Sequence, residues 1–168
     1  MVGTLAILVV EQAPDVQLNK LSMKSKDFST VSPQALEKVA RKVQIWDISN
    51  AALSPTRCNA IFPALLINPD IKEINLSDNS LSSVLPENVA KAVQKSRSFL
   101  LANTSLTVHQ VEAILTAVSS EASYLHTLDL LNNLLSVVEP QLLGDALMTL
   151  ESATLDDTSL TVAQVCRD

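Results

Sequence analysis

Six copies of one apolar pattern run along the chain, and together they leave few folds open. The pattern is apolar-x-x-apolar-x-apolar-x-x-z-x-apolar, where z is mostly a small or polar residue. Its third apolar position is taken in turn by Met23, Ile48, Leu76, Leu101, Leu130 and Leu155. A recurring pattern of this kind is typical of a solenoid, in which neighbouring repeats bury each other's apolar faces.

The spacing between the copies alternates. The successive intervals are 25, 28, 25, 29 and 25 residues, so the true unit is a pair of repeats. The z position alternates as well: it holds Asn79 and Asn133 in one class of repeat, and Thr104 and Thr158 in the other. The two remaining z positions hold Ala51 in the second class and Lys26, which departs from the first.

The asparagines at z are expected to form an internal ladder. After each strand the chain turns, and the backbone groups of the turn have no sheet partner. A buried Asn carries two donors and an acceptor, so Asn79 and Asn133 can satisfy these groups. The hydroxyls of Thr104 and Thr158 can do so on a smaller scale.

Amphipathic helices are expected between the copies. Prolines at 33, 86 and 140 open the helices of the first class, where a missing N–H is harmless. Ser or Thr precedes those of the second class and can accept the free amides of the first turn. In the segment 107–118 the apolar residues Val111, Ile114, Leu115 and Val118 share one face at helical spacing.

These residues resemble a leucine-rich repeat protein of the ribonuclease-inhibitor-like class, which includes receptors of the NOD-like type. The stretch Ile71 to Leu81 is similar to the strand signature of that family, and the resemblance covers nearly the whole chain. It implies an α/β horseshoe with parallel strands on the concave side and α-helices on the convex side. Strands are predicted at 20–23, 45–48, 73–76, 98–101, 127–130 and 152–155, within a single domain spanning 1–168.

Both ends of the chain fall within the helix of a repeat. Ala6 to Val10 aligns with the helix of a later repeat, and the Val162/Val165 face starts another. Solenoids usually carry polar caps. The uncovered faces are therefore expected to self-associate or to receive a further repeat of a longer array; the alternative is a small protein with frayed ends.

The composition excludes several classes of partner. The net charge of −6 argues against nucleic acid and favours a basic protein. The apolar run Leu5 to Val10 is too short to span a bilayer, so no membrane association is expected. Cys58 and Cys166 are about four repeats apart and cannot pair. A reducing, cytoplasmic setting is the simplest interpretation.

No pattern of catalytic, cofactor-binding or metal-binding residues stands out. The chain lacks a Gly-rich phosphate loop, a Cys-x-x-Cys and a His-Glu-x-x-His. We interpret His109 and His126 as polar surface residues and Cys58 as a core thiol. The chain is therefore predicted not to be an enzyme.

A protein-binding surface is predicted on the concave face. The middle outward column of the strands is expected to hold Ser22, Asp47, Asn75, Leu100, Asp129 and Thr154. The next column adds Ala102, Leu131 and Asp156. Leu100, Ala102 and Leu131 would form an apolar cluster, with Leu100 and Leu131 as anchors. Asp129 and Asp156 would steer a basic partner towards them.

Three kinds of binding role remain open at this point. The first is a scaffold of an innate-immune sensor or an inhibitor-type receptor. The second is an actin- or cytoskeleton-associated repeat module. The third is a regulator such as a GTPase activator, although no arginine is singled out by its position.

Overall fold

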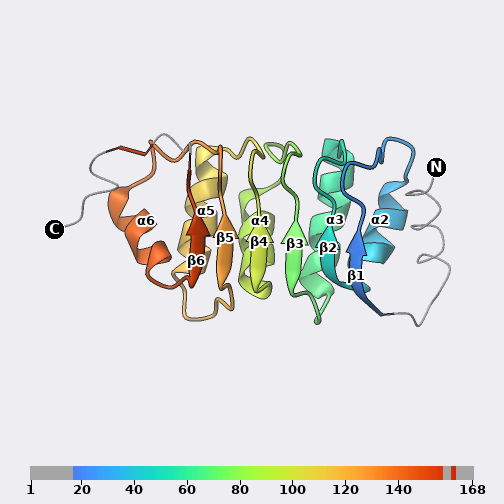
Figure 1. Cartoon of the computed structure of the whole chain (residues 1–168), viewed down its shortest axis with the longest axis horizontal. Coiled ribbons are helices and arrows are strands. Elements are labelled where there is room, and N and C mark those ends of the chain that lie inside the picture. Colours follow the sequence, from blue (N-terminus) through green and yellow to red (C-terminus); the bar gives the residue numbers. More distant parts are fainter. Residues whose placement is uncertain (1–16, 157–159, 162–168) are drawn as a thin grey trace.

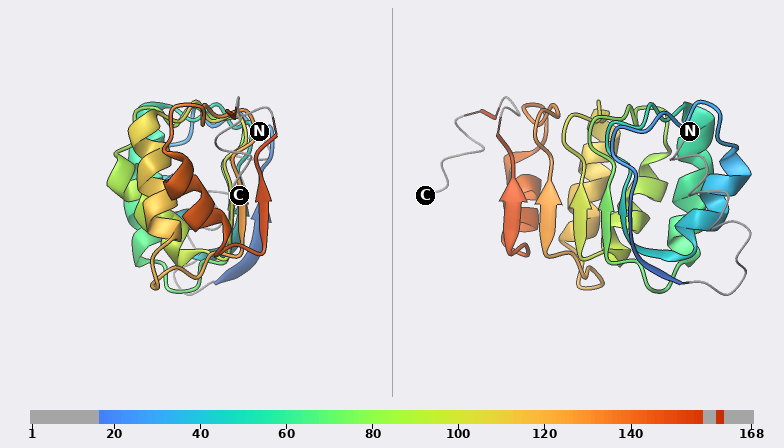
Figure 2. Two further views of the ribbon diagram at one scale, coloured as in Figure 1. Left: turned by 90° about the vertical axis from the view of Figure 1, so that its left-hand side faces the viewer. Right: turned by 45° about the vertical axis from the view of Figure 1, so that its right-hand side comes forward.

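The computed structural model describes residues 17–156, 160 and 161, which form a two-layer stack. Six strands lie side by side along the long axis, and the helices run behind them (Figure 1). A view along the stack separates the layers, with strands on one side and helices on the other (Figure 2). The predictions for residues 1–16, Thr158 and 162–168, which include both chain ends and Cys166, concern residues outside the described ranges.

The sheet is parallel throughout, and its strand order is that of the sequence. Its strands are β1 (Leu18–Ser22), β2 (Val43–Asp47), β3 (Glu73–Asn75), β4 (Ser98–Leu100), β5 (Thr127–Asp129) and β6 (Ser152–Thr154). Every strand overlaps its predicted window, which confirms the α/β solenoid. Each ends one residue earlier than predicted, although β1 and β2 also begin two residues earlier.

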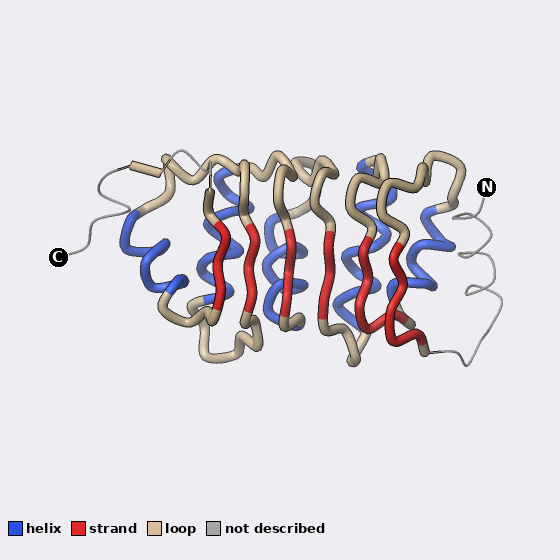
Figure 3. Tube along the Cα trace, in the orientation of Figure 1, coloured by secondary structure: helices blue, strands red, loops and turns tan. Residues whose placement is uncertain are grey.

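Helices fill the connections between strands, so that strand and helix alternate along the chain (Figure 3). They are α2 (Pro33–Ala40), α3 (Pro55–Ile67), α4 (Pro86–Lys95), α5 (Val108–Val118) and α6 (Pro140–Leu147). Within the described ranges, no helix is both long and apolar enough to cross a bilayer.

The structure contains the predicted residues at the helix starts, and two helices have a further such residue that was not predicted. Proline opens α2, α4 and α6 as expected, and it also opens α3. The hydroxyls of Ser54 and Thr107 accept from the backbone three residues on, as predicted for the second class. Ser32 caps α2 in the same way, although α2 belongs to the first class.

The core between the layers is mainly aliphatic, with a few large aromatic side chains. Trp46, Phe28, Phe62 and Phe99 are its largest fully buried members. Trp46 lies in β2, and its indole Nε1 has no hydrogen-bond partner among the described residues. As the chain has one tryptophan, Trp46 is a natural fluorescence reporter of unfolding.

The turns after β1 to β5 each use a left-handed residue just before the z position. Positive φ angles occur there at Ser25, Asn50, Asp78, Asn103 and Asn132. Asn and Asp tolerate this conformation better than other residues with a side chain, which lets the turn form without glycine. The amides of these residues bond to the next repeat, for example Asp78 to the carbonyl of Ala102 at 2.9 Å. The ladder of the sheet thus continues into the turns.

Candidate interaction surface

The outward column of the strand face is assembled as the register requires. Asp47 lies beside Asn75, Asn75 beside Leu100, and Leu100 beside Asp129. Ser22 and Thr154 extend the same row at the two ends. Six successive repeats therefore present one side chain each in a single row across the concave face.

Three polar members of this row also shape the chain. Oδ1 of Asp47 accepts from the amide of Ser49 at 3.1 Å, and Oδ1 of Asn75 accepts from Ser77 at 3.0 Å. Oδ1 of Asp129 accepts from the amide of Leu131 in the same way, at 3.0 Å. These are Asx turns, in which the side chain satisfies its own backbone two residues on. The sequence interpretation, which treated the three residues only as contact groups, missed this role.

Leu100 is the member of the row that cannot make such a turn. It is half-buried rather than fully exposed, and so is Leu131. Leu131 follows β5, the strand next to that of Leu100, and belongs to the next outward column. Its carbonyl accepts from the amide of Asn103 at 2.7 Å, which sets the register of the two segments at this point. Its lateral neighbour is accordingly Ala102. Both leucines therefore present less apolar surface than the sequence led us to expect. Asp156 is exposed in the turn after β6.

Asn79 bonds into the preceding repeat. Its Oδ1 accepts from the amides of Ala51 and Leu53 at 3.1 and 3.3 Å. Its Nδ2 donates to the carbonyls of Ile48 and Leu76, both at 2.9 Å. One buried amide thus closes the turn of its own repeat and that of the repeat before it.

Asn133 repeats this arrangement between β4 and β5. Its Oδ1 accepts from the hydroxyl of Thr104 and from the amide of Leu106, both at 3.2 Å. Its Nδ2 donates to the carbonyls of Leu101 at 2.7 Å and Leu130 at 3.2 Å. The one hydroxyl hydrogen of Thr104 is shared between Asn133 Oδ1 and the carbonyl of Leu101, which lies closer, at 2.7 Å. The two classes of z residue thus meet directly here.

A second kind of clamp, which the sequence interpretation missed, joins the other repeats. Gln110 in α5 is fully buried, and its Nε2 donates to the carbonyls of Leu81 and Val84 at 2.7 and 2.6 Å. Arg57 in α3 plays the same part, with Nε 2.9 Å from the carbonyl of Val31. Both stand three residues after the helix cap. A long polar residue at that shared position was the available signal.

The junctions from β1 to β5 therefore alternate. An asparagine joins β2 to β3 and β4 to β5, and we call these the asparagine junctions. A side chain from the first turn of a helix joins β1 to β2 and β3 to β4, and we call these the helix junctions. The alternating spacing in the sequence has this physical counterpart.

The titratable residues singled out in the sequence lie apart from one another. His109 is exposed on α5. His126 is exposed before β5, with Nδ1 2.8 Å from the Glu151 carboxylate. Cys58 is buried in α3. In the part of the chain that the structure describes, no three His, Cys, Asp or Glu residues are grouped so that they could hold a metal ion.

Burial of Cys58 has a measurable consequence at high pH. Desolvation raises the pKa of its thiol from 9.0 to about 11. The unfolded chain ionises first as the pH rises, so stability falls between about pH 9 and pH 11. We expect wild type to lose about 1 kcal/mol more than Cys58→Val between pH 8 and pH 10. Urea unfolding followed by Trp46 fluorescence measures the free energy of unfolding of each protein at the two pH values. An identical pH dependence in wild type and Cys58→Val would contradict the prediction.

The repeat signature itself is recognised by comparison with known families. The family model described as Leucine Rich Repeat matches residues 70–92, which span β3 and most of α4. The fold is a leucine-rich repeat solenoid. No curated protein matches the chain in sequence.

A solved structure supports the same leucine-rich repeat fold over most of the chain. It is described as the tropomodulin C-terminal domain from the structural genomics of Caenorhabditis elegans. The match covers 95% of this chain and 85% of that one, with a TM-score of 0.55 and 13% sequence identity. At that identity the likeness concerns the fold alone.

Proposed function

We propose that this leucine-rich repeat chain is a protein-binding scaffold without catalytic activity, and that its partner lies across the concave strand face. The observation that carries the proposal is the row of six aligned side chains, in which Leu100 replaces the turn-forming polar residues of its neighbours. Leu100 keeps apolar surface towards solvent although a polar residue there would also serve the turn. Contact with a partner would account for this choice, since contiguous apolar surface marks interfaces.

Charge along the strand face supports a basic contact at one end. Asp129 lies beside Leu100, and Asp156 follows β6. Lys20 and Lys24 lie at the opposite end, in and just after β1. A partner with a basic patch would therefore dock in one direction, with the acidic side chains raising the association rate more than the affinity.

The ribonuclease-inhibitor-like class remains part of the proposal. Its support is the alternation of two repeat classes, seen in the spacing and in the two kinds of junction. Within that class we favour a sensor or inhibitor-like binding role. A cytoskeletal role, or a regulator of the GTPase-activator type, is the alternative. The fold shared with the tropomodulin C-terminal domain is compatible with the cytoskeletal alternative but does not decide between them.

The test is a Leu100→Ser, Leu131→Ser double variant. Because both leucines are already half-buried, we expect their loss to remove about 1–3 kcal/mol of binding free energy, which is about fivefold to 150-fold in affinity. Proteins captured by the immobilised wild-type chain would be identified, and their dissociation constants measured with each variant.

The matched control is Leu85→Ser, Leu134→Ser. These leucines are more exposed, at 55% and 51%, but lie outside the strand face. The control should bind the partner as wild type does, and circular dichroism should show that both double variants are folded. Equal affinity of wild type and the Leu100/Leu131 variant would place the interface elsewhere.

A further inference from the structure

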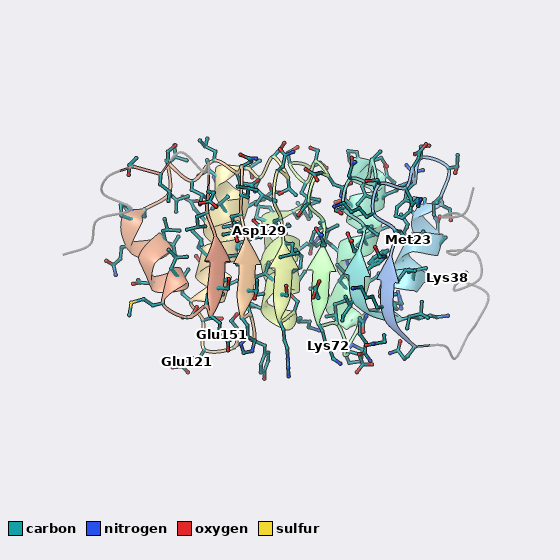
Figure 4. All side chains as sticks on the ribbon, viewed as in Figure 1. Met23, Lys38, Lys72, Glu121, Asp129 and Glu151 are labelled. Atoms are coloured by element: carbon teal, nitrogen blue, oxygen red, sulfur yellow. The ribbon has the colours of Figure 1, made fainter. Side chains whose placement is uncertain are left out.

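A pocket of about 240 Å³ opens at the edge of the molecule where the strands begin. Its walls are residues 69–72 together with Lys95, Arg97 and Tyr124. They come from the loop after α3, the end of α4, the residue before β4 and the loop before β5. Figure 4 shows Lys72 at this edge, well below Asp129 on the strand face. The pocket is therefore distinct from the row that contains Leu100.

The lining is basic, in contrast to the chain as a whole. Lys72, Lys95 and Arg97 contribute three positive charges and Asp70 one negative, which leaves +2 on a chain whose net charge is −6. The lysine ammonium groups have uncharged acceptors: Lys72 Nζ donates to Gln44 Oε1 at 2.8 Å, and Lys95 Nζ donates to the carbonyl of Leu66. Their charges thus remain available to an anion.

The frame of the pocket is fixed by backbone hydrogen bonds. The carbonyl of Lys72 accepts from the amides of Arg97 and Ser98, at 2.7 and 3.0 Å. Behind it, the buried side chain of Asn68 donates to the carbonyls of Ala40 and Val43. The backbone around the pocket is therefore already held in place, and a ligand has to immobilise only the exposed side chains of the lining.

We propose that this pocket binds an acidic segment of a protein. Arg97 offers the planar fork that suits a carboxylate, and the two lysines add point charges around it. Tyr124, which is 72% exposed, and Pro69 belong to the same lining. An apolar side chain of the bound segment can pack against them while a neighbouring carboxylate of that segment meets the cations. This pairing of cations with apolar surface fits a peptide better than a small inorganic anion.

The surroundings of the pocket limit the size of the anion. Glu121 and Glu151 lie along the same edge, beyond the basic lining (Figure 4). An extended polyanion such as a lipid surface or a nucleic acid would bring its phosphates against these carboxylates. A short acidic segment avoids that repulsion.

The test uses the full chain and a fluorescein-labelled oligoglutamate peptide, with binding followed by fluorescence anisotropy at low salt. We expect Lys95→Gln, Arg97→Gln to weaken binding about fivefold to tenfold, since two exposed charge contacts are lost. The matched control is Lys20→Gln, Lys24→Gln, which removes the same charge at the β1 end and should change affinity by less than about twofold. The Leu100→Ser, Leu131→Ser variant should bind the peptide as wild type does.

Several outcomes would overturn the proposal. If the Lys95/Arg97 variant and the Lys20/Lys24 variant weakened peptide binding equally, the attraction would be non-specific. If wild type did not bind the peptide measurably, there would be no such site. Inorganic phosphate that displaces the peptide as effectively as unlabelled oligoglutamate would assign the pocket to a small oxyanion. Phosphatidylserine vesicles that bind wild type but not the Lys95/Arg97 variant would assign it to a lipid surface.

Discussion

Replacing Phe99 by alanine is expected to lower the free energy of unfolding by about 3–5 kcal/mol. Phe99 is fully buried in β4, between Ile74 of β3 and Leu128 of β5. Strands on both sides hold the frame in place, so the structure can close only part of the cavity that the substitution leaves. Urea unfolding followed by Trp46 fluorescence and circular dichroism measures the loss.

Tyr124→Ala is the matched control, because it removes an aromatic ring that is 72% exposed. It should shift stability by less than about 0.5 kcal/mol. If Phe99→Ala does not fold, Phe99→Leu provides the measurement, with an expected loss of about 1 kcal/mol. A loss for Phe99→Ala no larger than that for Tyr124→Ala would contradict the buried core position.

Replacing Asn79 by alanine is expected to cost about 3 kcal/mol. The substitution leaves the amides of Ala51 and Leu53 and the carbonyl of Ile48 without their side-chain partner in a buried turn. Each unsatisfied buried group costs about 1–3 kcal/mol, partly offset by relaxation of the turn. Thermal and urea unfolding would measure the loss.

Asn88→Ala is the control of the same chemistry. Asn88 lies in the first turn of α4 and is only half-buried, and alanine favours a helix, so stability should stay within about 0.5 kcal/mol of wild type. If the two asparagine variants unfold alike, Asn79 does not join the repeats as described.

The repeat pattern predicted the strands well because each buried position recurs at a fixed offset. Ile74, Phe99 and Leu128 occupy equivalent positions, and the sheet pairs them directly. The asparagines at z were also recognisable, since a polar residue inside an apolar pattern needs buried partners. The pattern placed the end of each strand one residue too late. The third apolar position of the pattern is still buried after β1 to β5, but the chain has already left the strand there.

Other features depend on contacts that the pattern does not encode. The Asx turns of Asp47 and Asp129 are local bonds, and from the sequence these residues were indistinguishable from solvent-exposed acids. The half-burial of Leu100 depends on the side chains around it. The basic pocket combines four segments whose charges are scattered in the sequence, and the net charge of −6 drew attention away from them.

The alternation of junctions limits how an array of this type can change in length. Removing one repeat would bring two repeats of the same class together: β3 placed directly after β1 would set Asn79 against a turn built around Lys26. Removing two repeats, such as the 53 residues from Ile48 to Leu100, restores the original sequence of junctions. The smallest block that can be duplicated or deleted without leaving buried groups unpaired is therefore two repeats, so we expect an array of this type to change in length in steps of that size.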